Sequence, residues 1–82
     1  ENEAISLYPN PASGTLFVQL NGKQAFNEIN IMNIIGQTVR KVTIENNESL
    51  LKINLDDSFT AGIYFVSVTG TQKTITKKII VY

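Results

Sequence analysis

The serine hydroxyls and the clustered carboxylates are the side chains of this sequence that could do chemistry. A serine becomes a nucleophile only beside a base, and the sequence has no histidine to act as that base. It also has no cysteine, which removes a thiolate nucleophile. A serine–lysine pair is the arrangement that remains, and no spacing in the chain supports one. We therefore expect no catalytic residue and no enzyme activity. The serines are Ser6, Ser13, Ser49, Ser58 and Ser67.

Acidic residues in the second half of the chain could supply oxygen ligands to calcium. Asp56 and Asp57 are adjacent, and Glu45 and Glu48 precede them. The ordered ligand spacing of an EF-hand loop is missing, and adjacent acids in a loop are usually solvated. Without histidine or cysteine, the chain also lacks the ligands that zinc, copper and iron prefer. We expect no metal site and no cofactor.

The charge balance argues against a nucleic-acid surface. Seven basic and seven acidic residues give a net charge of zero, whereas phosphate binding needs a basic excess. The distribution is uneven, because residues 58–82 carry Lys73, Lys77 and Lys78 as their only charged side chains. Lysines on a strand usually mark a solvated edge that discourages sheets from pairing. We favour that interpretation over a membrane or nucleic-acid patch.

The length of 82 residues is enough for one hydrophobic core and not for two. We therefore expect a single domain over residues 1–82, with residues 1–4 as the end of a linker from a parent protein. No apolar run exceeds four residues, far below the roughly 18 that span a bilayer. No leader pattern precedes residue 10. We expect neither a membrane span nor a complete secretory precursor.

Strand signals dominate the chain. Short stretches rich in Ile, Val, Thr, Phe and Tyr recur between turn residues, with no sustained helical periodicity. Seven short strands at this spacing predict an all-β fold, a seven-stranded antiparallel immunoglobulin-like β-sandwich. The expected strands are Ala4–Tyr8, Thr15–Leu20, Glu28–Ile34, Gln37–Ile44, Leu50–Leu55, Ile63–Thr69 and Thr74–Val81.

Several local features refine these strands. We expect Pro9 and Pro11 to stop the first strand after Tyr8, since proline has no amide donor for a ladder. Val39 and Val42 break strict alternation, which predicts a β-bulge near Arg40-Lys41. Phe59 is expected to anchor the long loop over 56–62 from beneath. Three inward-facing sets are expected: Leu16, Val18 and Leu20; Leu51, Ile53 and Leu55; Tyr64, Val66 and Val68.

The aromatic residues bear on a carbohydrate-binding alternative. Tryptophan is absent, and the scattered Phe and Tyr residues favour core packing over a flat binding platform. Phe17 and Phe65 are expected on outer faces, where they could meet a partner. An accessory immunoglobulin-like module of a secreted enzyme, adhesive or carbohydrate-binding, stays open as the alternative function.

Four sequence blocks carry a family resemblance. The segment 5–14, Ile-Ser-Leu-Tyr-Pro-Asn-Pro-Ala-Ser-Gly, resembles the opening of the C-terminal sorting domains that direct Bacteroidetes proteins through the type IX secretion system. Segments 33–37, 61–64 and 77–81 agree with that family in order and spacing. The resemblance runs from about residue 4 to residue 82. Tyr82 departs from it, since members often finish on lysine or another polar residue.

The resemblance implies a function and partners. Such a domain directs a larger cargo protein across the outer membrane, so this one would pass through the periplasm and reach the cell surface or the medium. Its partners would be the type IX outer-membrane translocon and a sortase-like peptidase that removes the domain. An exposed edge could also accept a strand from a partner, by β-augmentation, or from a second copy in a homodimer. The residues expected to meet the translocon are Pro9, Asn10, Pro11, Gly36, Gly62, Tyr64, Lys77, Lys78, Ile79, Ile80 and Val81.

Overall fold

The computed structural model describes residues 5–21, 26–45 and 48–82, and within those ranges it contains strands and no helix. The predicted all-β class is therefore confirmed. The strands are β1 (Ile5–Ser13), β2 (Thr15–Leu20), β3 (Phe26–Met32), β4 (Thr38–Thr43), β5 (Leu50–Asn54), β6 (Gly62–Gly70) and β7 (Thr74–Val81).

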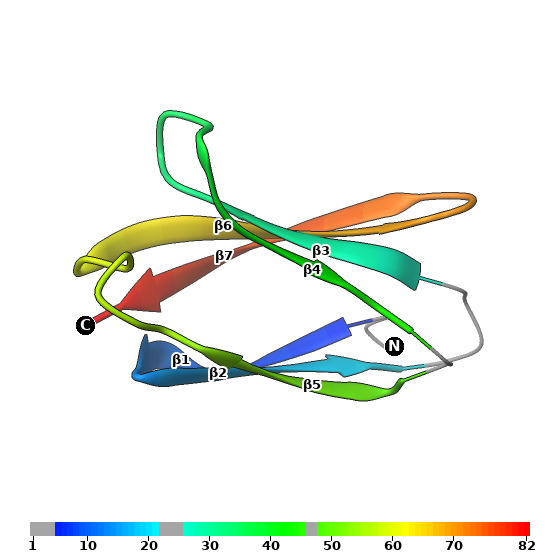
Figure 1. The fold of residues 1–82 in the computed structure, drawn as a ribbon, viewed down its shortest axis with the longest axis horizontal. Coiled ribbons are helices and arrows are strands. Elements are labelled where there is room, and N and C mark those ends of the chain that lie inside the picture. Colours follow the sequence, from blue (N-terminus) through cyan, green and yellow to red (C-terminus); the bar gives the residue numbers. More distant parts are fainter. Residues whose placement is uncertain (1–4, 22–25, 46–47) are drawn as a thin grey trace.

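Two antiparallel sheets face each other in the sandwich (Figure 1). One sheet contains β1, β2 and β5, and the other contains β4, β3, β6 and β7 in that order. Strand β1 joins them, because its first residues pair with β2 while Ala12 pairs in parallel with Val81 of β7. The continuous order is β4-β3-β6-β7-β1-β2-β5. The path of β1 therefore brings the first and last strands of the chain together.

The prolines interrupt the β1 ladder without ending the strand. Pairing with β2 runs as far as Tyr8 opposite Phe17 and resumes at Ser13 opposite Thr15, with a register shift between them. The prediction that the strand stops after Tyr8 was wrong, because β1 continues to Ser13. Proline cannot donate to a ladder, but it can lie in extended backbone where the chain changes partners. Pro9 and Pro11 lie where β1 leaves β2 and approaches β7.

Hairpin β3–β4 contains the expected bulge. Ile31 pairs with Arg40 and Met32 pairs with Thr38, so Val39 is the extra residue. This position is one residue before the predicted Arg40-Lys41. The bulge lets Val39 and Val42 both pack against the core although they are three residues apart. The alternation that the sequence seemed to break is thus restored by the extra residue.

The core fills the space between the sheets and draws on both of them. Each predicted inward set contributes: Leu20 and Leu55 are partly buried, and the other members are buried. Phe59 is buried beneath the β5–β6 connection, as expected. The buried apolar side chains are Ile5, Ala12, Leu16, Val18, Phe26, Ile29, Ile31, Leu51, Ile53, Phe59, Tyr64, Val66, Val68, Ile79 and Val81.

Arg40 ties β4 to the β5–β6 connection. Its guanidinium donates to the carbonyl oxygen of Asn54 at 3.1 Å and to Oδ2 of Asp56 at 3.0 Å. The same group lies 5.2 Å from the ring centroid of Phe59, a cation–π arrangement. One side chain therefore connects the edge of one sheet to the loop that leaves the other.

Asp56 should make stability depend on acid pH. Its Oδ1 accepts hydrogen bonds from the hydroxyl and the amide of Ser58, at 2.6 and 3.0 Å, and these bonds, with the charge of Arg40, hold the pKa of Asp56 below its ordinary value. Because the folded pKa is the lower one, this contribution is present above the unfolded pKa and is lost as pH falls through the folded pKa. We expect wild type to exceed Asp56→Asn in free energy of unfolding near neutral pH, and the difference to shrink in acid. Urea denaturation of both proteins across a pH series measures it, and a pH-independent difference would contradict the assignment.

Candidate functional site

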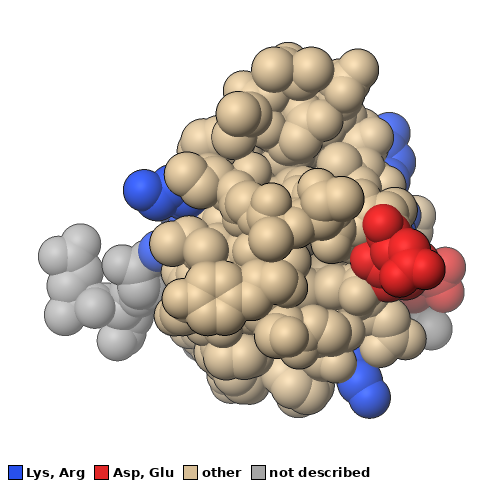
Figure 2. Space-filling model, turned by 90° about the vertical axis from the view of Figure 1, so that its left-hand side faces the viewer, with Lys and Arg blue, Asp and Glu red and all other residues tan. Residues whose placement is uncertain are grey.

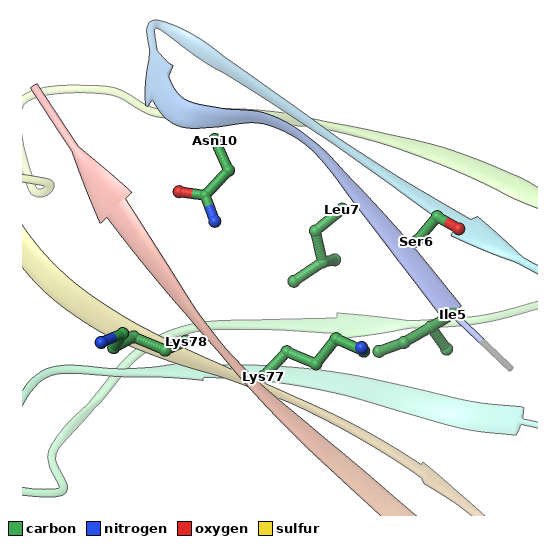
Figure 3. A pocket seen from close by; sticks show the side chains of 6 residues that line it. All are labelled: Ile5, Ser6, Leu7, Asn10, Lys77 and Lys78. Atoms are coloured by element: carbon green, nitrogen blue, oxygen red, sulfur yellow. The ribbon is translucent and has the colours of Figure 1, made fainter. Parts of the chain in front are cut away.

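A groove of about 450 Å³ opens between β1 and β7 (Figure 3). The two strands meet at Ala12 and Val81 and diverge from that point. The groove therefore lies where the first and last strands of the chain separate. Its lining residues are Ile5, Ser6, Leu7, Asn10, Lys77 and Lys78.

Asn10 connects β1 to β7 at the end of the groove where the two strands meet. Its Oδ1 accepts a hydrogen bond from the amide of Ile80 at 3.0 Å, and the amide of Tyr82 donates to the carbonyl of Ala12 at 2.9 Å. The segment around Pro9 and Pro11 thus presents a side chain that takes the place of a strand partner for Ile80. The proline segment and the terminal strand, two separate blocks of the sequence, form one structural unit.

The two lysines of β7 lie on opposite faces of the sheet. Lys77 pairs with the buried Val66 and starts on the inner face, whereas Lys78 pairs with Phe65 on the outer face. Figure 3 shows Lys77 extending toward Ile5 and Lys78 extending in the opposite direction. Lys77 is half-buried and Lys78 is exposed. The two lysines therefore form no single exposed pair, and Lys78 presents its charge outward.

The other predicted recognition residues divide into accessible and structural ones. Ile79 and Val81 are buried in the core, while Ile80 between them is 38% exposed. Tyr64 is also buried, and its hydroxyl donates to the carbonyl of Thr60 at 2.7 Å. Gly62 pairs with Val81 at the start of β6. Ile79, Val81 and Tyr64 therefore belong to the core, and Asn10, Lys77 and Lys78 line the groove. The exposed members of the predicted set are Pro9, Asn10, Pro11, Gly36, Gly62, Lys78 and Ile80.

Gly36 does not line the groove and belongs to the turn between β3 and β4. Its φ of 88° is in the left-handed region that favours glycine. Asn33 organises this turn, because its Oδ1 accepts from the amides of Ile35 and Gln37 at 3.1 and 3.0 Å. Ile34 and Ile35 are 69% and 74% exposed at its tip. The predicted strand to Ile34 is too long, because β3 ends at Met32, and Asn33 is a residue type that signals a turn.

Replacing Asn33 with alanine should loosen this turn. The change removes the acceptor of two backbone amides, and we expect it to lower the free energy of unfolding by about 1 kcal/mol. Asn33→Asp keeps the Oδ1 acceptor and is the matched control. Urea denaturation and backbone amide exchange at Ile35 and Gln37 measure the effect. Equal stability and exchange for the alanine and aspartate variants would contradict this role.

The outer-face aromatic residues are less exposed than the sequence suggested. Phe17 and Phe65 are both half-buried. The Phe17 ring stacks on the ring of Tyr8, with 5.6 Å between the centroids and 24° between the planes. Phe65 lies between Met32 and Lys78 in the ladder. Their role in docking stays a prediction.

Charge is sparse on the end of the molecule where β6 begins and β7 finishes. Figure 2 shows this end as mostly uncharged, with one acidic cluster and a few basic side chains toward its margins. Within the three described ranges, no group of three or more acidic, cysteine or histidine residues could hold a metal ion. Over the same residues, no helix has the length and apolar character to cross a membrane.

Comparison with known proteins connects this geometry to a family. Residues 6–82 match the model of a family described as the secretion system C-terminal sorting domain. The chain is also 38% identical over 64 residues to Beta-agarase A from Zobellia galactanivorans. That alignment covers 78% of this chain and 11% of the agarase, so the chain spans a small part of that relative. The matched span includes every strand and both walls of the groove, apart from the first residue of β1.

Proposed function

The chain belongs to the secretion system C-terminal sorting domain family, and from that premise we propose which surface of the domain the export machinery binds. Its function is that of a type IX secretion signal on a larger cargo protein. The family is one of sorting signals and not of catalysts, and the proposal includes no enzymatic step for this chain. The cargo is secreted or displayed at the surface, and we place its transit through the periplasm within the proposal.

The proposed contact surface is the β1–β7 groove with its rim. One observation carries the proposal: Asn10 of the proline segment bonds the amide of Ile80 in the terminal strand, so two distant family-like blocks make one surface. A translocon that binds this surface would recognise the folded domain and not a linear segment, because Ile79 and Val81 beneath the surface belong to the core. An incompletely folded domain would not present it.

Further partners belong to the same proposal. A sortase-like peptidase would remove the domain after transport by cutting upstream of β1. Nothing in this proposal calls for a nucleic acid or a cofactor. A homodimer formed through two β7 edges is the weaker alternative, because it would bring the lysines of both copies close together.

A transport assay tests the function. The domain is fused to the C-terminus of a leader-bearing fluorescent reporter and expressed in a type IX-competent Bacteroidetes strain and in a translocon mutant. We expect reporter on the surface or in the medium of the competent strain alone. Reporter that stays in the periplasm of both strains, while the domain is folded, would refute the function.

Two charge-reversal variants test in the same assay whether Lys78 belongs to the contact surface. Lys78→Glu alters the rim of the groove, and Lys52→Glu alters an exposed lysine on β5, in the other sheet. We expect Lys78→Glu to lower export and Lys52→Glu to leave it unchanged. Equal export of both variants would exclude Lys78 from the contact surface.

A further inference from the structure

Among the residues that the structure describes, few lie against the edge of β7 that faces the groove. On its other side β7 pairs with β6 from Thr74 to Val81. On the groove side, the described part of the chain gives β7 one ladder partner, Ala12 opposite Val81. An unpaired strand edge is a template for a further strand. Thr76 and Lys78 thus lie on the part of the edge that no described strand covers.

The orientation of the backbone groups along this edge follows from Ile80. Its amide points toward β1, because it donates to Oδ1 of Asn10 at 3.0 Å. Amide and carbonyl groups alternate in direction along a strand, so those of Lys78 and Thr76 point to the same side. Asn10 already supplies an acceptor to the next amide in this row. An incoming strand would continue the row that Asn10 begins.

The charged side chains near the β7 edge favour a partner strand of opposite charge. Strands β1, β6 and β7 contain no aspartate or glutamate, while β7 carries Lys77 and Lys78 and Lys73 directly precedes it. Lys78 lies on the outer face and is exposed, and Lys73 in the preceding turn is exposed as well, so positive charge is accessible beside the edge. A strand with carboxylates would complement this charge, and a second copy of β7 would oppose it.

The geometry points to strand addition: the open edge of β7, from Thr74 to Lys78, binds an extended acidic segment of a partner protein. Backbone hydrogen bonds to Thr76 and Lys78 would hold the segment, and apolar side chains on its inner face would enter the groove beside Ile5 and Leu7. This inference deepens the proposed sorting function and rests on it for the identity of the partner. The occupant is an acidic strand from the export machinery.

Peptide binding to the isotope-labelled chain tests strand addition directly. The probe is a capped synthetic octapeptide of alternating glutamate and valine, and its lysine–valine counterpart is the control. We expect the acidic peptide to shift the amide resonances of Thr74, Thr76 and Lys78, with affinity at least about tenfold above that of the basic peptide. Equal affinities, shifts confined to other strands, or no binding of the acidic peptide would overturn the inference.

A matched pair of variants separates backbone pairing from simple charge attraction. Thr76→Pro removes an amide that faces the groove and not β6, and proline is tolerated at such an edge position. Thr76→Ala keeps that amide and loses the same hydroxyl. We expect the proline variant to bind the acidic peptide at least about tenfold more weakly than the alanine variant, with both folded by their amide spectra. Equal binding by the two folded variants would overturn strand addition.

The transport assay distinguishes this inference from the function on which it rests. If the wild-type fusion stays in the periplasm while the peptide binds the β7 edge, the sorting role fails and strand addition stands. If Thr76→Pro loses peptide binding but is exported like Thr76→Ala, the sorting role stands and strand addition fails as its contact.

Discussion

Replacing Ile79 with alanine is expected to lower the free energy of unfolding by about 2–4 kcal/mol, and the same change at Ile80 by under about 1 kcal/mol. The two residues are adjacent in β7 and face opposite ways. Ile79 is 0% exposed beside other core residues, and Ile80 is 38% exposed. Truncating Ile79 leaves a cavity that the packed surroundings can only partly fill. Urea denaturation of both variants measures the difference, and similar losses for both would contradict the assigned strand faces.

This pair also decides how terminal deletions should be interpreted. An 82-residue domain is expected to have a total stability of about 4–12 kcal/mol. Removing residues 77–82 would take Ile79 and Val81 from the core together with the exposed residues of the rim. If export is lost after that deletion, the cause could therefore be unfolding of the domain or loss of the recognition surface, and the deletion does not separate the two. Ile80→Ala, or removal of Tyr82, which is 76% exposed, tests recognition with the core intact.

Replacing Phe59 with alanine is expected to lower the free energy of unfolding by about 3–4 kcal/mol. Phe59 is 7% exposed, and its ring lies 5.4 Å from the ring of Tyr64 and 5.2 Å from the guanidinium carbon of Arg40. The variant loses the buried ring and leaves Arg40 without its cation–π contact. The effect should therefore extend from the loop to β4.

Phe59→Leu is the matched control for the shape of this cavity. Leucine refills much of the space, so we expect a loss of about 1–1.5 kcal/mol. Denaturant titration gives the free energies, and amide exchange at Arg40 and Asp56 shows whether the loop has come away from β4. Equal losses for alanine and leucine would place the role of Phe59 outside core packing.

Much of the fold follows from local sequence patterns. Alternating apolar residues in β2, β5 and β6 point inward as expected, because the two-residue period of a strand sends every second side chain to one face. The bulge in β4 was predictable from Val39 and Val42 for the same reason. The family was identifiable from four blocks of sequence, and the match over residues 6–82 confirms it.

Local rules fail at two places where the partner strand decides the structure. Proline's missing donor predicts an end of β1 after Tyr8, yet β1 changes sheets there and its backbone stays extended to Ser13. The β-branched side chain of Ile34 is typical of a strand, but the turn that Asn33 organises begins at Asn33 and includes Ile34. A propensity describes one residue, whereas a strand exists only where a neighbour pairs with it.

The sequence by itself determined the strand class, the inward faces and the absence of a histidine or cysteine site, because composition and a two-residue period are local properties of a chain. The tertiary structure alone decided which recognition candidates share a surface. Asn10 and Ile80 are 70 residues apart in sequence, and their hydrogen bond exists because β1 crosses from one sheet to the other. The burial of Ile79 and the exposure of Lys78 depend likewise on the pairing of β7 with β6. Such long-range pairing is set by the packing of the whole core, which no short segment of sequence contains.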